Sequence, residues 1–367
     1  MHIVNGIINS MLLNLLKALL FQTQRQAPVS DAEKCRMALT AGHLDAASRI
    51  LRKTIKHNVN EPELWFLQGE IEWRRGDHMA ALAAYQKASD YAPANPCYRL
   101  KIGECHHRLG NDEEAALLCK VLLAQDPNFN PARALLCDIE LPGPGYMEVL
   151  AHLHDTLRPS TYLEVGVAAG HTLCLAARST SAVGIDPNPV INVALGPNTK
   201  IFKMTSDEFF GNENAQSVLQ GRSINMAFID GMHRYEFVLR DFRAIEKYCD
   251  ASSVVLIHDC YPTDRESATN VQLTKFWSGD VWKSIVALKK YRPDLKIHTI
   301  ATGPTGLALV SNLDRNSTVL HEHMDEITAE MNATDFSALE RRKRELLNCY
   351  PNEWREIDSL VARRGVH

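Results

Sequence analysis

The chain has 367 residues, which is more than one ordinary hydrophobic core organises, so its length predicts two domains or one domain with a repeat array. A formal charge of −4 with 45% apolar residues describes a mildly acidic globular protein, which excludes a disordered chain and argues against a nucleic-acid partner. The nine cysteines are odd in number and contain no C-x-x-C pair, so neither a disulfide framework nor a zinc site is indicated. A reducing, cytoplasmic location is the simplest expectation.

The first 27 residues are rich in apolar side chains. They lack the basic start and the A-x-A site of a signal peptide, polar residues such as Asn9 and Lys17 interrupt the apolar run, and the run is too short to span a membrane. We expect an amphipathic helix over residues 1–27, packed on the protein itself or on a dimer mate, with attachment to a membrane surface as the alternative.

A 34-residue period follows, between about residues 28 and 129. The spacing recurs in three sets of small residues and prolines: Gly42, Gly76 and Gly110; Ala47, Ala81 and Ala115; Pro93 and Pro127. The central copy also has Trp65, Gly69 and Tyr85 at characteristic places. This pattern resembles the tetratricopeptide-repeat family, with two good copies and a degenerate first one. We therefore expect an all-α domain over residues 28–140 that associates with a protein partner or with a second copy of the chain.

The prolines and glycines of "LPGPG" cannot continue a helix array, so a domain boundary is predicted at 141–145. From Tyr146 a helix is followed by alternating strand-like and helical stretches, including "TYLEV", "SAVGID", "INMAFID" and "SVVLIHD". This alternation predicts an α/β domain over residues 146–315 with a mostly parallel sheet and a C-terminal antiparallel hairpin. The charged tail over residues 316–367 is expected to be helical, with "ERRKREL" as a solvated face.

Polar residues and glycines follow the expected strands. In "YLEVGVAAGHT", Glu164, Gly166 and Gly170 lie at the first strand-to-helix turn, without the G-x-G-x-x-G or P-loop pattern. Asp186 ends the next strand about twenty residues later, where a carboxylate can accept hydrogen bonds from ribose hydroxyls. The third strand leads to Ser206 and Asp207, which would lie beside an adenine edge or would cap a helix.

The order of these features, with "FIDGMHRYEFVLRDF", "VVLIHDCYP" and a terminal "PTGLALV", resembles the class I S-adenosylmethionine-dependent methyltransferases over residues 146 to about 312. Within them it is similar to a branch of small-molecule O-methyltransferases that includes sugar-methylating enzymes. The resemblance implies a Rossmann-like seven-stranded sheet with the cofactor at its C-terminal edge. The residues that it implies for cofactor binding are Glu164, Gly166, Gly170, Asp186, Ser206, Asp207 and Asp230.

Asp230 and Asp259 end the fourth and fifth strands, so both carboxylates are expected at the same sheet edge, where two oxygen ligands suit Mg²⁺. In the sugar-methylating relatives, the histidine at the D-x-x-H spacing of Asp230 and His233 is the general base. His258 stands where metal-dependent relatives have an oxygen ligand, so another divalent metal, or none, remains open. Two structural interpretations also remain open. Asp230 and Asp259 cap helices, or His258 is a histidine of the hydrophobic core.

These observations predict an S-adenosylmethionine-dependent methyltransferase that acts on a hydroxyl group of a sugar or natural-product small molecule, with His233 as base. Two alternatives remain. The acceptor is a peptide or carrier-bound compound captured by the repeats, or the chain is a non-catalytic repeat scaffold.

Overall fold

The computed structural model describes residues 29–362, so the helix expected over residues 1–27 lies outside the described residues. The chain divides into two compact units, Met1–Ala115 and Ala116–His367. The division falls inside helix α7 (Asp112–Gln125), some distance before the boundary predicted from the sequence. None of the helices within residues 29–362 is long and apolar enough to cross a membrane.

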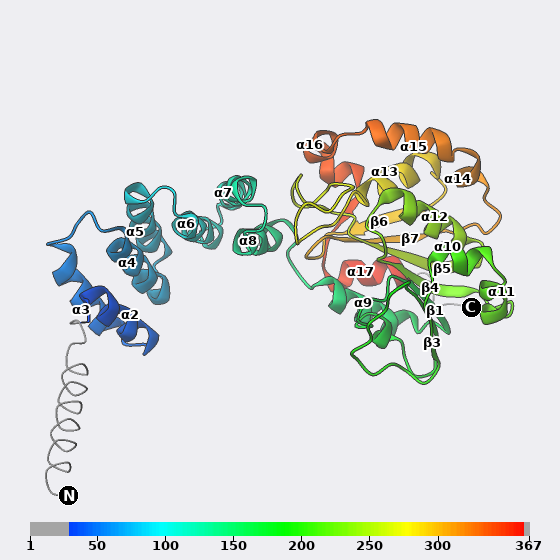
Figure 1. The fold of residues 1–367 in the computed structure, drawn as a ribbon, viewed down its shortest axis with the longest axis horizontal. Helices are drawn as coiled ribbons and strands as arrows, with labels where there is room; N and C mark the ends of the chain where they lie inside the picture. The colour runs from blue at the N-terminus through cyan, green and yellow to red at the C-terminus, as the bar shows by residue number, and fades with distance from the viewer. Residues whose placement is uncertain (1–28, 363–367) are drawn as a thin grey trace, which may run out of the picture. The chain divides into compact units, whose positions relative to one another are not determined.

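The first unit consists of antiparallel helix pairs (Figure 1). Its helices before α7 are α2 (Asp31–Thr40), α3 (Leu44–Ile55), α4 (Pro62–Arg75), α5 (His78–Tyr91) and α6 (Pro96–Arg108). The three glycines of the 34-residue period follow α2, α4 and α6 and have φ between 77° and 81°, which suits glycine and ends a helix. Tyr85, Ala81 and Ala88 are buried between the helices, as expected from a repeat stack.

The second unit is built on an eight-stranded sheet in the order β3-β2-β1-β4-β5-β7-β6-β8. Its strands are β1 (Thr161–Val165), β2 (Ser181–Ile185), β3 (Thr199–Phe202), β4 (Ile224–Ile229), β5 (Cys249–His258), β6 (Lys296–Ile300), β7 (Leu307–Ser311) and β8 (Cys349–Tyr350). Strands β1 to β5 pair in parallel, and β7 lies antiparallel between β5 and β6. The predicted terminal hairpin is therefore present.

The expected count of seven strands is wrong by one, because β8 comes from the C-terminal tail. Its two residues pair in parallel with Thr299 and Ile300 of β6. Without β8, β6 would be a fully exposed edge strand, and covering such an edge limits unwanted pairing. A two-residue strand has too little periodicity to be recognised in a sequence otherwise read as helical.

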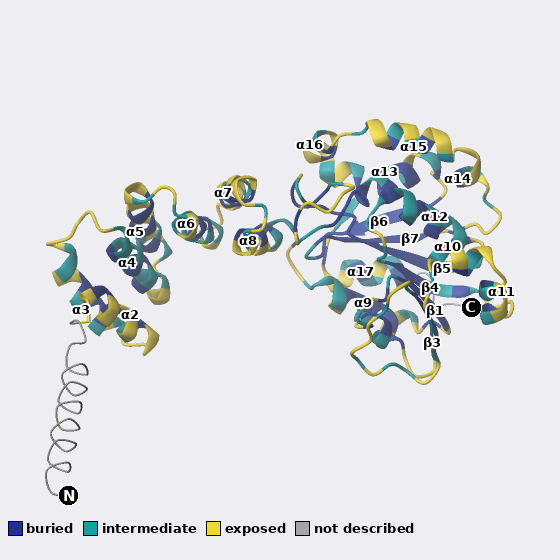
Figure 2. Cartoon of the chain, in the orientation of Figure 1, coloured by how far each residue is buried: buried dark blue, intermediate teal, exposed yellow. Residues whose placement is uncertain are grey.

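Helices cover both faces of the sheet (Figures 1 and 2). Helices α9 (Tyr146–Leu157) and α17 (Trp354–Val361) share one buried cluster with Tyr162 and Phe228. On the other face, α12 (Tyr235–Glu246) and α13 (Trp282–Tyr291) pack on the alternate strand residues, such as Leu163 and Val165. The remaining helices are α8 (Asn130–Glu140), α10 (Ser206–Gly211), α11 (Asn214–Leu219), α14 (Val319–Glu322), α15 (Met324–Ala333) and α16 (Phe336–Leu346).

Two of the expected crossover helices do not form. Only a single 3₁₀ turn (Leu173–Leu175) lies between β1 and β2, and residues 186–198 between β2 and β3 contain no helix. Three prolines and Gly196 in the second stretch prevent a helix from continuing. The turn after β1 is instead shaped by hydrogen bonds to Asp186, described below.

Candidate active site

A cavity of about 510 Å³ lies at the carboxyl ends of the parallel strands. Its wall comes from the turn after β1, the end of β2, the start of α10 and the segment after β4. Five of the predicted cofactor residues line it together: Gly166, Asp186, Ser206, Asp207 and Asp230. The structure thus brings to one cavity residues that are up to 64 positions apart in the chain.

The turn after β1 requires glycine at position 166. Gly166 has φ +89°, and a Cβ atom there would lie 1.9 Å from the carbonyl oxygen of Asp230. The next two backbone N–H groups, of Val167 and Ala168, donate hydrogen bonds to Oδ2 of Asp186 at 2.9 and 2.8 Å. The N–H of Asn188 donates to Oδ1 at 2.7 Å. Asp186 therefore shapes the turn as well as lining the cavity.

Glu164 and Gly170 do not line the cavity. The fully buried carboxyl group of Glu164 accepts hydrogen bonds from the hydroxyls of Tyr162 and Thr172, both at 2.7 Å. Burial raises the pKa of Glu164 to about 8, although the two hydrogen bonds oppose the rise. Its position follows from strand alternation, because Glu164 points to the face opposite Val165.

At the start of α10, the helix cap is Thr205 and neither of the two predicted residues. Its side chain accepts a hydrogen bond from the N–H of Glu208, whose carboxylate bonds back to Thr205. Ser206 and Asp207 are thus the first two helical residues and line the cavity, and Asp207 forms an ion pair with Arg240.

Asp230, His233, His258 and Asp259 form a cluster of alternating charge, and the first two line the cavity. His233 Nε2 lies 3.4 Å from Asp230 Oδ1, and His233 Nδ1 lies 3.1 Å from Asp259 Oδ2. His258 Nδ1 lies 3.2 Å from Asp230 Oδ1 and 3.6 Å from Asp259 Oδ1. The four residues predicted for base and metal therefore meet at one place.

Two family models match parts of the chain. The family model described as "Methyltransferase domain" matches residues 163–260, from β1 to the residue after Asp259. The second unit carries a methyltransferase domain. The family model described as "Tetratricopeptide repeat" matches residues 36–96 and 71–128, so the helices of that region are tetratricopeptide repeats.

No curated protein matches the chain. Among solved structures, cofactor-bound Rv0187 from MTB is similar with 14% identity and a TM-score of 0.35, covering 54% of this chain and 94% of its own. A mutant O-GlcNAc transferase from Thermobaculum terrenum has 13% identity and a TM-score of 0.29, covering 54% of this chain and 44% of its own. Neither likeness is close enough to carry an argument.

In the methyltransferase domain, the charges within the cluster shift the pKa values of its members. Burial alone would lower the pKa of His233, but its contact with Asp230 and the charge of Asp259 outweigh burial and raise the pKa to about 9. For His258 the same two carboxylates overcome burial and raise the pKa to about 10. Burial would raise the pKa of Asp230, but the two imidazoles hold it well below its usual range. Without a bound cation, both histidines are therefore charged at neutral pH.

The proton on His233 Nδ1 is fixed by its surroundings. Nδ1 lies 3.0 Å from the carbonyl oxygen of Trp277 and 3.1 Å from Asp259 Oδ2, and both of these oxygens only accept hydrogen bonds. Nε2 faces a single acceptor, Asp230 Oδ1, at the longer distance of 3.4 Å. Nδ1, with two nearer acceptors, thus keeps its proton when the ring is neutral, and Nε2 becomes the basic nitrogen. A backbone carbonyl that fixes the tautomer in this way is typical of histidines that bind metals or transfer protons.

The group best arranged to hold a cation is Asp230, His233 and Asp259, whose ligand atoms all lie within 4.8 Å of one another. The buried Oδ2 of Asp259 lies 3.1 Å from His233 Nδ1 and has no other hydrogen-bond partner among the described residues, so it has a lone pair left for a cation. His258, predicted as a ligand, instead contacts Asp230 through Nδ1 and Thr305 Oγ1 through Nε2 at 3.3 Å.

Sequence reasoning missed Asp241, a buried residue of α12 that lines the cavity. Burial raises its pKa to about 7, while a hydrogen bond from Ser206 opposes the rise. The signal was present in the sequence, because Asp241 interrupts an apolar stripe formed by Val238, Phe242 and Ile245 at helical spacing. A buried acid with a perturbed pKa in a cavity is a candidate ligand-binding residue.

Proposed function

We propose that the chain is an S-adenosylmethionine-dependent methyltransferase that methylates a hydroxyl group of a sugar or natural-product small molecule. The observation that carries the proposal is the meeting of Gly166, Asp186 and Asp230 in one cavity wall, with His233 next to Asp230. The cavity's volume falls within the range of small-molecule sites, about 300–1,000 Å³.

The cavity offers groups suited to the two ends of a nucleoside. The Asp186 carboxylate can accept about four hydrogen bonds and receives three from backbone N–H groups, which leaves capacity for a ribose hydroxyl. At the other end, the ring of Phe237 offers an apolar surface to a base, and Asp241 offers an acceptor to an exocyclic amino group. When bound, S-adenosylmethionine supplies the electrophilic methyl group.

His233 is the proposed general base, acting through Nε2. A hydroxyl hydrogen-bonded to Nε2 would transfer its proton there while Nδ1–H stays bonded to the carbonyl of Trp277. Asp230 and Asp259 stabilise the resulting imidazolium, since both raise the pKa of His233. Holding the acceptor and the methyl donor in line supplies most of the acceleration.

The proposed base has to be neutral before it acts. A divalent cation on Asp230 and Asp259 would neutralise the charges that keep His233 protonated and would acidify a hydroxyl bound to it. Nε2 of His233 either receives the proton or ligates the cation, because its single lone pair cannot do both. We favour the role of base.

Labelled methyl transfer tests the proposal. The purified full chain is incubated with methyl-labelled cofactor and a panel of sugars and diols, with Mg²⁺, with Mn²⁺ or with chelator. We expect His233→Ala to bind the cofactor and the cation but to lose transfer. Undiminished transfer would refute the base, and loss of cation affinity in this variant would make His233 a ligand instead. Transfer that survives chelation would remove the metal from the proposal.

A protein acceptor is the second candidate, because the tetratricopeptide repeats over residues 36–128 favour contact with another protein. The same labelled reaction with a protein extract, followed by separation by size, distinguishes the two candidates. Label in the macromolecular fraction that depends on His233 would favour a protein acceptor. Label confined to small molecules would favour the first proposal.

A further inference from the structure

A long segment without helices or strands, residues 260–281 between β5 and α13, connects the charged cluster to helix α8. We call it the β5–α13 segment. Many of its polar residues are buried, including Asp264, Ser267 and Ser278. Because it has no regular hydrogen-bond ladder, its shape depends on the side-chain and turn contacts that hold it.

The C-terminal end of the β5–α13 segment, residues 277–280, which we call its inner end, contacts His233 and the backbone that follows it. The carbonyl of Trp277 accepts the hydrogen bond from Nδ1, and the indole stacks on the imidazole with ring centroids 5.4 Å apart. Gly279 has φ +65°, and a Cβ atom there would lie 1.6 Å from the carbonyl oxygen of His233. Asp280 accepts a hydrogen bond from the N–H of Tyr235 at 3.1 Å. Both the ring and the backbone of His233 are held from this side.

His233 needs such support, because its backbone lies in the left-handed region with φ 51°. A residue other than glycine in a sparsely populated conformation costs about 1–3 kcal/mol and persists only when its surroundings determine it. A loosened inner end would therefore allow His233 to relax and to move away from Asp230.

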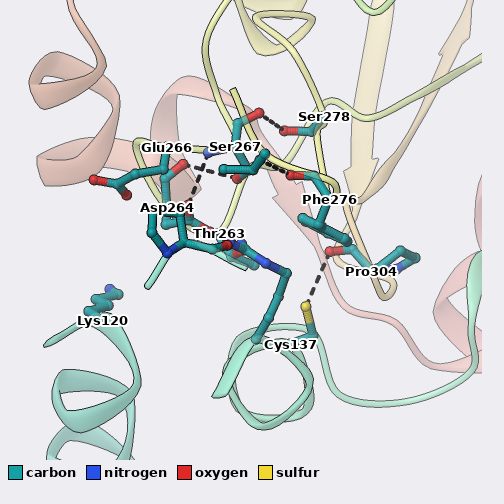
Figure 3. A network of polar contacts seen from close by, with 12 residues as sticks. Lys120, Cys137, Thr263, Asp264, Glu266, Ser267, Phe276, Ser278 and Pro304 are labelled. Carbon is teal, nitrogen blue, oxygen red and sulfur yellow. Dashed lines mark hydrogen bonds and ion pairs between the residues drawn. The ribbon is translucent and has the colours of Figure 1, made fainter. Parts of the chain in front are cut away.

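Ser267 joins the middle of the β5–α13 segment to its C-terminal end by hydrogen bonds. Its carbonyl oxygen accepts hydrogen bonds from the N–H groups of Ser278 and Gly279, both at 3.1 Å, and from the Ser278 hydroxyl, also at 3.1 Å. The N–H of Ser267 donates to Asp264 Oδ1 at 3.0 Å. Figure 3 shows Asp264, Ser267 and Ser278 in this network. Asp264 therefore sets the position of the residue that closes the loop.

Other residues of the segment contact α8 and the turn before it. Arg133, on α8, forms a buried ion pair with Asp264, and the side chains are only 4% and 5% exposed. Its guanidinium also donates to the carbonyl of Pro127 at 2.9 Å and lies 4.6 Å from the ring centroid of Phe276. The N–H of Lys275 adds a hydrogen bond to the Asn128 side chain at 2.9 Å.

A second contact of α8 leads toward His258. The thiol of Cys137 donates to the carbonyl of Pro304 at 3.5 Å, as Figure 3 shows. The next residue, Thr305, lies with its hydroxyl 3.3 Å from His258 Nε2. Helix α8 thus touches the two segments that hold the two histidines of the cluster.

We infer that Arg133 is a positioning residue for His233. Through Asp264 and Ser267 it holds Trp277 and Gly279 against the imidazole and its backbone. The catalytic part of this inference rests on the proposed function, but the mechanical link from α8 to His233 does not.

Hydrogen–deuterium exchange tests the link without any substrate. In full-length Arg133→Met, we expect faster exchange in residues 264–281 and in the peptide that contains His233. The matched control is Arg292→Met, which breaks another buried ion pair of this unit, with Glu246. The control should speed exchange around residue 292 and leave the His233 peptide unchanged. If both variants affect the His233 peptide equally, or if neither does, Arg133 has no positioning role.

Kinetics separates positioning from stability. Arg133→Met leaves Asp264 buried without its cation, which lowers stability. The double variant Arg133→Met with Asp264→Asn has no unpaired acid there, so it should recover thermal stability. We expect kcat to be up to about a hundredfold below that of the wild type in both variants, because a shift of about 1 Å at the reacting groups has that effect. KM for the cofactor should change little, because Arg133 does not line the cavity.

The double variant also covers the case in which the single variant does not fold. Recovery of kcat together with stability would reduce Arg133 to a structural role and overturn the inference. If the wild type transfers no methyl group to any acceptor, the proposed function fails, while the exchange experiment still decides the link.

Discussion

Adding a single methyl group at Gly279 should displace His233 and so disable the site. In Gly279→Ala, the Cβ atom would lie 1.6 Å from the carbonyl oxygen of His233, where ordinary contacts begin at 3.4 Å. The two backbones therefore have to separate by about 1.8 Å, judged from these two distances. Displacements of about 1 Å at reacting groups cost about a hundredfold in rate, so kcat should fall by at least that factor.

The assay for Gly279→Ala measures kcat and cofactor affinity alongside thermal unfolding. Alanine at φ +65° also costs about 1–2 kcal/mol of stability through the backbone alone. The control is Gly221→Ala, which has φ +79° but no atom within 4 Å of its added Cβ. It should lose similar stability and keep its kcat and cofactor affinity. Equal kcat in the two alanine variants would refute the claim that Gly279 holds His233 in place.

Two further predictions concern the buried acids. Because the pKa of Glu164 is raised to about 8, the folded state holds a proton that the unfolded chain releases above its ordinary pKa of 4.5. The free energy of unfolding should thus fall by about 3–5 kcal/mol as pH rises through this window. Thermal melts between pH 5 and 8.5 should show a smaller fall in Glu164→Gln than in the wild type. Equal pH dependence in the two proteins would refute the prediction. Asp241→Asn should weaken cofactor binding about tenfold in calorimetry, because it replaces one carboxyl oxygen in the cavity with an NH₂ group that cannot accept a hydrogen bond, and unchanged affinity would exclude Asp241 as a contact.

Features with a local physical cause were predictable from the sequence. The 34-residue period was readable because the helix-ending turns place glycine at positive φ, as at Gly76. The convergence at the sheet edge was readable because parallel strands end on the same side, which brings Asp186 and Asp230 together. The spacing of Asp230 and His233, and the adjacency of His258 and Asp259, were enough to predict a cluster.

Features that depend on distant contacts were not predictable. The stacking of Trp277 on His233 and the ion pair of Arg133 with Asp264 join residues 44 and 131 positions apart. Nothing in local spacing indicates such pairs. The tautomer of His233 follows from its contact with the Trp277 carbonyl, so it too had to await the structure. The two missing crossover helices show the opposite error, in which a regular pattern was extended over a stretch broken by prolines.

The attachment of α8 limits how the repeats of this chain can be exchanged for others. A graft that joined foreign repeats at residue 141 would discard Arg133, Cys137 and the helix that carries them. A junction within or before α7 would instead keep these contacts and the backbone carbonyl of Pro127 that Arg133 uses. Helix α8, which follows the last repeat, thus has to be kept with the methyltransferase domain when the repeats are replaced.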